Sequence, residues 1–260
     1  MADTEKELSI YEHLGELRRV FIISILSVIV FAIGLYFVSD YILEVLTYPV
    51  TSLGHELHVL HITEALMTKI KLCLFLGLVA ALPIVLWQVW SFILPALKRD
   101  EKKYFTLFVV LSYLAFITGL SFAFFVVYRL GVQFLLRFAG DALLPMLTIG
   151  NYVGFTITFL VPFGLVFQLP LAAYLLAKLG VISQGFLKKG RKFALLIIVI
   201  ISSMLTPADI VTCIVMAAPM YSLYELSIWI VGLVERRKAR AREKAEREAA
   251  AAEEAEEDSE

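Results

Sequence analysis

The sequence has little charge for its length. Only 18% of its 260 residues are Asp, Glu, Lys or Arg, against 60% that are hydrophobic. That balance excludes an ordinary water-soluble globular protein, whose surface needs a larger polar share. Cysteine is scarce as well: Cys73 and Cys213 lie inside or at the edge of apolar blocks and share no metal-binding or redox spacing. Both are therefore interpreted as packing residues.

Motifs for common enzyme chemistry are missing. The sequence contains no Walker phosphate loop, no nucleophile elbow, no zinc-protease helix motif and no dinucleotide fingerprint. ATP hydrolysis and intramembrane proteolysis are therefore not expected. His55, His58 and His61 recur at intervals of three, but this spacing matches no strong zinc pattern and a solvated loop is preferred. Neither a metal nor a cofactor is predicted.

Apolar residues instead form blocks that can cross a bilayer, which takes about 20 helical residues. Six blocks qualify, of which the fifth is the shortest: 20–38, 70–92, 105–128, 152–177, 193–205 and 210–234. The sequence therefore predicts an all-α integral membrane protein with six transmembrane helices, the fifth and sixth of them short. A re-entrant hairpin of the last two blocks is the alternative, which the polar turn at 206–209 disfavours.

Positive charge is distributed unevenly over the segments that join the blocks. Of the 23 Lys and Arg residues, the segments assigned to the outside and their flanks hold only Lys69, Lys71, Arg129 and Arg137. Because positive charge is retained on the cytoplasmic side, both termini are predicted to be cytoplasmic. The predicted layout is an amphipathic N-terminal helix (1–19), the six-span membrane domain (20–234) and a charged tail, helical or disordered, with no assigned function (235–260).

Proline interrupts the second, fourth and sixth blocks. Each proline in a membrane helix removes a backbone hydrogen bond and bends the helix. A curved, concave bundle is the predicted shape. The longer outer connections, 39–69 and 129–151, alternate apolar and polar residues and are predicted to form short interfacial helices.

A short polar pattern precedes the first span. Ser9 and Glu12 have the spacing of a capping box, so a helix is predicted to begin at Ser9 and to continue into the span. In the stretch HLGELRR that follows, Glu16 is placed to pair with Arg19 one turn on, while Arg18 and Arg19 fix the topology. On pattern alone, an interfacial helix is the preferred interpretation.

Four other polar residues are candidates for a functional role, but their sequence patterns are less specific. Glu101, in the first inner connection, suits the start of a helix or a solvated, charge-mixed loop. Glu225 lies inside the sixth block, where an ionisable group is costly and often functional, unless it reaches the interface. Thr206 is predicted to cap the start of a helix, and Asp209, three residues later, is predicted to accept a hydrogen bond in its first turn. Gln168 is uncharged and suits a hydrogen bond across helices.

Four stretches together resemble TatC, the membrane receptor subunit of the twin-arginine protein translocase: HLGELRR, WQVWSFILPALKRDE, FGLVFQLP and LTPADIVTCIVMAAPMYSLYEL. The resemblance extends over residues 9–234. It implies a non-enzymatic receptor in the bacterial inner membrane that binds twin-arginine signal peptides of folded cargo at the cytoplasmic face. It also implies export driven by the proton motive force. The implied partners are TatB and TatA type single-span proteins, other TatC copies and membrane lipid, without nucleic acid.

The resemblance also implies residue roles. Glu16 and Glu101 match the two family glutamates that receive the paired arginines, and His13, Arg18 and Arg19 belong to the first motif. A guanidinium is a rigid donor fork that fits a carboxylate, so two arginines need two acceptors.

Further positions match the family by motif. Gln168 stands on the implied concave polar face where the family usually has glutamate, so a proton relay is not expected there. The surroundings of Thr206 resemble the docking site for TatB or TatA helices. Structural or assembly roles are assigned to Pro49, Thr206, Asp209 and Glu225.

A second function from another class is a proton-coupled secondary transporter of small solutes. That function needs an ionisable or discontinuous-helix site at the bilayer midplane and an internal repeat. The sequence shows no convincing repeat, and its charged candidates cluster towards the surfaces.

Overall fold

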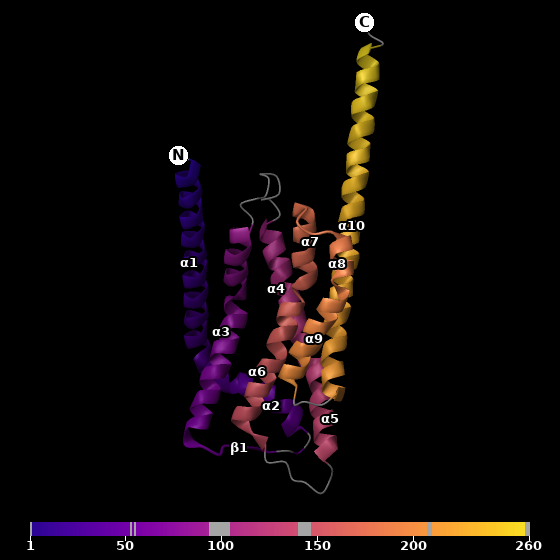
Figure 1. Cartoon of the computed structure of the whole chain (residues 1–260). Coiled ribbons are helices and arrows are strands. Elements are labelled where there is room, and N and C mark those ends of the chain that lie inside the picture. Colours follow the sequence, from indigo (N-terminus) through magenta and orange to yellow (C-terminus); the bar gives the residue numbers. More distant parts are fainter. Residues whose placement is uncertain are drawn as a thin grey trace. The chain divides into compact units, whose positions relative to one another are not determined.

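Helices account for nearly all of the described chain in the computed structural model (Figure 1). The structure describes residues 2–52, 54, 56–93, 105–139, 147–206 and 210–257, and of residues 2–13, 93, 135–139 and 249–257 the backbone alone. The α-helices in chain order are α1 (Ala2–Leu35), α2 (Ser39–Thr51), α3 (Ile62–Ile93), α4 (Phe105–Phe122), α5 (Arg129–Ala139), α6 (Ile149–Val166), α7 (Leu169–Leu179), α8 (Gln184–Lys189), α9 (Arg191–Leu205) and α10 (Ile210–Glu257).

Short elements of other kinds join these helices. A 3-10 turn (Tyr36–Val38) links α1 to α2, and a π-helical turn (Ala123–Tyr128) links α4 to α5. Two parallel strands of two residues each, β1 (Leu57–His58) and β2 (Leu147–Thr148), pair Leu57 with Leu147. The connections 39–69 and 129–151 contain α2 and α5, so the prediction that they form helices is confirmed, while their interfacial location stays a prediction.

Five helical segments of the described chain are long and apolar enough to span a membrane: Leu14–Thr51, Ile62–Phe92, Phe105–Phe134, Ile149–Leu179 and Ile210–Glu248. The chain is thus an all-α membrane protein. The predicted fifth span falls in α9, whose 15 residues reach about 22 Å, less than the roughly 30 Å of a bilayer core. The count of six spans and the cytoplasmic termini stay predictions.

The predicted start of the first helix is wrong. α1 begins at Ala2, not at Ser9, so Ser9 lies inside the helix and does not cap it. The residues before Ser9 include strong helix formers, Glu5 to Leu8, and acidic side chains that suit the positive end of the helix dipole. No breaker separates them from the apolar run, and the helix therefore extends towards the N-terminus.

The predicted fourth span is not one continuous helix. α6 ends at Val166 and α7 starts at Leu169, with a turn at Phe167 and Gln168. Pro170 explains the position of the break, because a proline ring clashes with the carbonyl four residues earlier, here that of Val166. Gln168 consequently precedes α7, and its carbonyl accepts the N–H of Ala172 at 2.9 Å.

The chain divides into two compact units, residues 1–165 and 166–260. In unit 1, α1 and α3 pack antiparallel and close together (Figure 1). Gly77 on α3 permits this: a Cβ there would lie 2.6 Å from the carbonyl oxygen of Val28 and 2.8 Å from the Cβ of Ala32. Any side chain at position 77 would force the two backbones apart.

Aromatic side chains fill the rest of unit 1. Tyr128 is fully buried, and its hydroxyl accepts a hydrogen bond from the Thr156 hydroxyl at 2.6 Å. The Tyr152 hydroxyl donates to the carbonyl of Leu46 at 3.0 Å and so joins α6 to α2. These buried polar groups thus have hydrogen-bond partners within the protein, as buried polar groups generally do.

One carboxylate joins the connections 39–69 and 129–151 of unit 1. Glu64 at the start of α3 accepts the backbone N–H of Leu60 and that of Gly150, each at 2.9 Å. A Cβ at Gly150 would lie 2.8 Å from the Cγ of Glu64, so a larger residue there would displace the Glu64 side chain. Glu64 thereby fixes α6 beside the start of α3.

Unit 2 is built around α10. Val231 is fully buried and packs with Ala173 and Ala177 of α7. α7 ends at Gly180 in the left-handed conformation (φ 80°), which glycine adopts without strain. α8 starts after Ser183, whose hydroxyl accepts the N–H of Phe186. α10 continues as a helix through the charged tail as far as Glu257.

Candidate functional site

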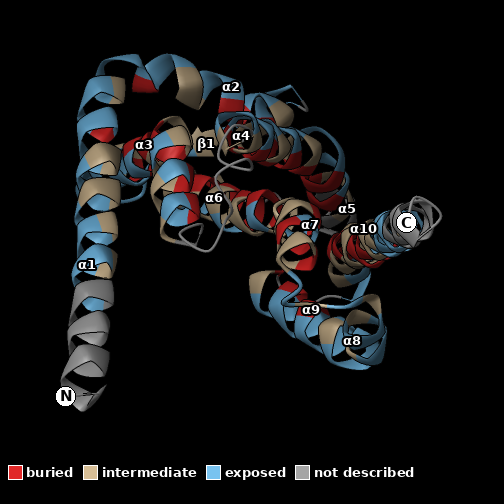
Figure 2. Ribbon diagram, turned by 90° about the horizontal axis from the view of Figure 1, so that it is seen from above, coloured by how far each residue is buried: buried red, intermediate tan, exposed pale blue. Residues whose placement is uncertain are grey.

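The first candidate site lies on the N-terminal half of α1. Glu16, Arg18 and Arg19 are all exposed, and Figure 2 shows that exposed residues prevail along the described part of this helix. The side chain of His13 lies outside the described residues. Glu16 precedes Val28 by twelve residues, or about 18 Å along the helix. Because α1 runs antiparallel to α3, this places Glu16 towards the end of unit 1 where α3 terminates (Figure 1).

Two aromatic pairs hold that same end together. The ring centroids of Trp87 and Phe105 are 4.6 Å apart at an interplanar angle of 72°, and those of Trp90 and Phe108 are 4.8 Å apart at 83°. Both are edge-to-face contacts, which stabilise a pair beyond the burial of its area. They fix the C-terminal end of α3 against the first turn of α4.

Glu101 belongs to the connection between these two helix ends and lies outside the described residues. In sequence it stands four residues before Phe105, the first residue of α4. The structure therefore supplies one of the two predicted carboxylates, Glu16, and the anchor points of the segment that carries the other. No group of three His, Cys, Asp or Glu side chains in the described ranges is arranged to hold a metal ion.

The residues assigned to assembly lie on α2 and on the last helices. Pro49 is inside α2. Thr206 is buried at the end of α9, in extended conformation, and its hydroxyl donates to the carbonyl of Ser202 at 2.9 Å. Asp209 falls outside the described residues, and the capping by Thr206 stays a prediction. Gln168 is half-buried at the break before α7.

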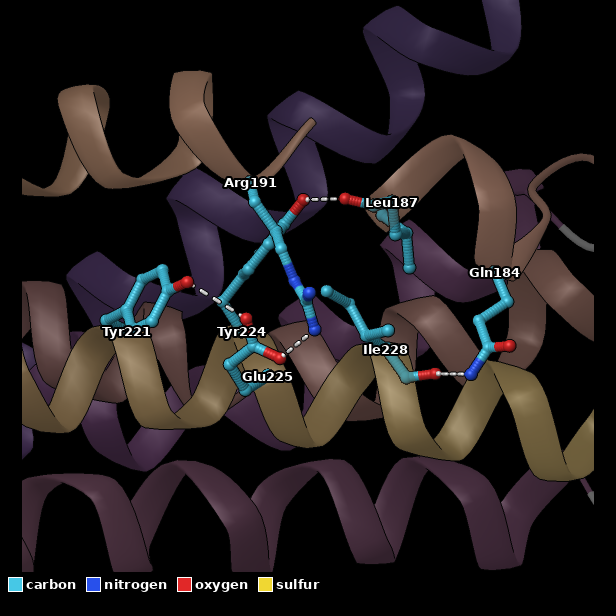
Figure 3. A network of polar contacts seen from close by, with 7 residues as sticks. All are labelled: Gln184, Leu187, Arg191, Tyr221, Tyr224, Glu225 and Ile228. Atoms are coloured by element: carbon cyan, nitrogen blue, oxygen red, sulfur yellow. Dashed lines mark hydrogen bonds and ion pairs between the residues drawn. The ribbon is translucent and has the colours of Figure 1, made fainter. Parts of the chain in front are cut away.

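Glu225 has partners within unit 2 that the sequence did not reveal (Figure 3). Its Oε2 lies 2.6 Å from Nη2 of Arg191 on α9, and its Oε1 accepts the hydroxyl of Tyr221 at 2.9 Å. The side chains of Arg191 and Glu225 are 45% and 34% exposed. Glu225 is therefore a partly buried, paired carboxylate rather than an isolated charge in the span.

Two neutral contacts extend this network. The hydroxyl of Tyr224 donates to the carbonyl of Leu187 at 2.8 Å, and Nε2 of Gln184 donates to the carbonyl of Ile228 at 3.3 Å (Figure 3). Both contacts tie α8 to α10, whereas the ion pair of Arg191 and Glu225 ties α9 to α10. Tyr221 precedes Glu225 by one helical turn, a spacing from which this contact could have been inferred. Nothing in the local sequence identifies Arg191.

The chain is similar to proteins of one family along most of its length. Residues 12–219 match the family model TatC, described as Sec-independent protein translocase protein. The chain is 45% identical over 231 residues to the Sec-independent protein translocase protein TatC of Carboxydothermus hydrogenoformans, covering 88% of this chain and 95% of the relative. It is 36% identical to the TatC protein of Aquifex aeolicus, covering 87% and 96%.

Solved structures agree with this similarity. The crystal structure of a protein described as twin arginine translocase receptor TatC superposes with a TM-score of 0.80 at 36% identity, covering 86% of this chain and 99% of that chain. A structure of such a receptor in the detergent DDM superposes with a TM-score of 0.78, also at 36% identity. At this identity the similarity extends beyond the fold alone.

Proposed function

Because this chain belongs to the TatC family, whose members are components of a Sec-independent protein translocase and not enzymes, we propose that it is the receptor and core subunit of a twin-arginine translocase. The observation that carries the proposal is its similarity to a solved twin arginine translocase receptor over 86% of the chain. The family assignment disfavours the alternative of a small-solute transporter.

The proposed ligand is the twin-arginine signal peptide of a folded cargo protein. Glu16 is the proposed acceptor for one guanidinium and Glu101 for the other, with His13, Arg18 and Arg19 shaping the site around Glu16. An exposed carboxylate on a rigid helix supports this, because a bidentate pair needs an acceptor of fixed orientation. The aromatic pairs that fix α3 to α4 hold together the two helix ends between which Glu101 stands in the sequence.

The proposed assembly includes single-span proteins of the TatA and TatB types, other TatC copies and membrane lipid. Their proposed docking region surrounds Thr206, and structural or assembly roles are proposed for Pro49, Asp209 and Glu225. The proposed setting is the bacterial inner membrane, with six spans and both termini in the cytoplasm. The proposed driving force is the proton motive force, as the resemblance to the family implies.

Crosslinking to a photoreactive twin-arginine signal peptide tests the receptor function. The variants Glu16→Lys and Glu101→Lys are compared with Glu44→Lys, which reverses an exposed carboxylate on α2. Crosslinking is expected to fall at least about tenfold in the first two variants, because charge reversal turns attraction into repulsion, and to persist in the control. A twin-lysine peptide is expected to bind more weakly than the twin-arginine peptide. Undiminished crosslinking in both site variants would refute the assignment.

A further inference from the structure

The inward face of α10 is defined beyond the end of its apolar part. Val231 packs against α7, and Oε1 of Glu235 accepts the backbone N–H of Gln184 at 3.0 Å. The ammonium of Lys238 donates to the carbonyls of Ala177 at 3.1 Å and Lys178 at 2.6 Å. These contacts, all within unit 2, show which side of α10 faces its neighbours.

The opposite side of α10 is exposed and changes from apolar to basic. Leu226 and Trp229 are 43% and 61% exposed. Three arginines follow on that same side: Arg236, Arg237 and Arg240. At 3.6 residues per turn they lie within about 100° of one another around the helix axis. The first of them stands two residues after the predicted end of the span. These three residues are called the arginine stripe. The arginine stripe lies on the same side of α10 as the exposed apolar residues and directly follows them along the helix.

Cations farther along the same side are already paired. Nζ of Lys244 lies 3.4 Å from Oε1 of Glu248, and Nη2 of Arg247 lies 2.8 Å from Oε1 of Glu243. The arginine stripe is exposed and forms no ion pair with any described residue. Three guanidinium groups that can donate further hydrogen bonds therefore lie next to the apolar face. The cations that are paired with glutamates lie farther along α10 towards its C-terminal end.

We propose that the arginine stripe binds the headgroups of anionic phospholipids. The face that carries Leu226 and Trp229 requires acyl chains, and the headgroup layer follows where the apolar residues end. A guanidinium binds phosphate oxygens bidentately, and a lipid with net negative charge supplies that group without the choline cation of a zwitterionic lipid. Free phosphate would satisfy the arginines but would leave the apolar face uncovered, so a phospholipid is the assigned ligand.

Fluorescence quenching of Trp229 in the full chain, reconstituted into bilayers, tests this assignment. Brominated phosphatidylglycerol or brominated phosphatidylcholine is added as a minor component to a phosphatidylcholine bilayer. The signal of Trp229→Phe is subtracted to remove the contributions of Trp87 and Trp90. Phosphatidylglycerol is expected to be enriched near Trp229 by about tenfold, from the attraction of several cations at the membrane surface. Equal quenching by the two lipids in the wild-type chain would overturn the proposal.

Two variants with the same loss of charge locate the site. R236Q/R237Q/R240Q is expected to abolish the preference for phosphatidylglycerol. R242Q/K244Q/R247Q is expected to retain it, because two of its residues are already paired with glutamates. Loss of the preference in the second variant alone would contradict the assignment to the stripe. Reversal of the quenching by soluble glycerol phosphate would show a general anion site and would also overturn it.

Discussion

In unit 1, α1 crosses α3 at Gly77, where no side chain separates the two backbones, whereas in unit 2, α9 is tied to α10 by the ion pair of Arg191 and Glu225. Helices in lipid gain little from burying apolar surface, since acyl chains are as apolar as leucine. Close backbone contact and polar side chains are the two remaining means of association. Close backbone contact depends on the shape of the two helix surfaces. Association through polar side chains tolerates changes of shape but depends on charge and on hydrogen-bond donors.

The largest expected effect comes from a methyl group at the α1–α3 crossing. Gly77→Ala places a Cβ 2.6 Å from the Val28 carbonyl oxygen, so the helices must separate, at an expected cost of about 2 kcal/mol in the free energy of unfolding. Titration with a denaturing detergent, followed by circular dichroism, measures this loss.

Gly154→Ala is the matched control for that change. Gly154 lies inside α6 of the same unit, and a Cβ added there would meet no atom within 4 Å. Alanine at this position is expected to stabilise the helix by up to about 1 kcal/mol, because it has the higher helix propensity. Equal effects at positions 77 and 154 would show that the crossing does not depend on close approach.

The second expected effect is a coupling between Arg191 and Glu225. A double-mutant cycle with Arg191→Met and Glu225→Gln is expected to give a coupling of about 1 kcal/mol, since both side chains are about a third or more exposed and each single change leaves a charge without its partner. Unfolding of the purified chain in detergent supplies the four stabilities. The control cycle uses Lys244 and Glu248, whose exposed pair is expected to couple by less than about 0.5 kcal/mol. A coupling no larger than the control would refute the role of the ion pair.

Local sequence patterns predicted the overall architecture but missed where one helix starts and where another breaks. The apolar blocks predicted the helical membrane architecture, because length and hydropathy are local properties. The start of α1 was misplaced because Ser9 suits a cap only where the preceding residues are not helical. The break at Gln168 was missed, although Pro170 marks it, because a proline in a membrane helix can either bend the helix or end it, and the neighbouring helices decide between the two.

The partners of individual side chains depend on tertiary structure and were not predicted. Gly77 is one of fourteen glycines in the sequence, and only the position of Val28 on another helix distinguishes it from Gly154. Glu225 was identified as a costly residue, but its counter-ion lies 34 positions earlier. Glu16 was predicted from a motif, and the structure adds its exposure and the direction of its helix. Neither periodicity nor composition contains these distances between helices.

The smallest expected effect concerns a polar contact of unit 2 beyond the apolar part of α10. Lys238→Met keeps most of the side-chain length but removes the donor to the carbonyls of Ala177 and Lys178. Those carbonyls belong to the last turn of α7, where a cation is favourable, so a loss of about 0.5–1 kcal/mol is expected. Lys244→Met, which removes only an exposed pair, is expected to cost less than about 0.5 kcal/mol. Hydrogen exchange at the end of α7 should accelerate only in Lys238→Met; acceleration in neither variant would mean that packing by Val231 alone holds α7 to α10.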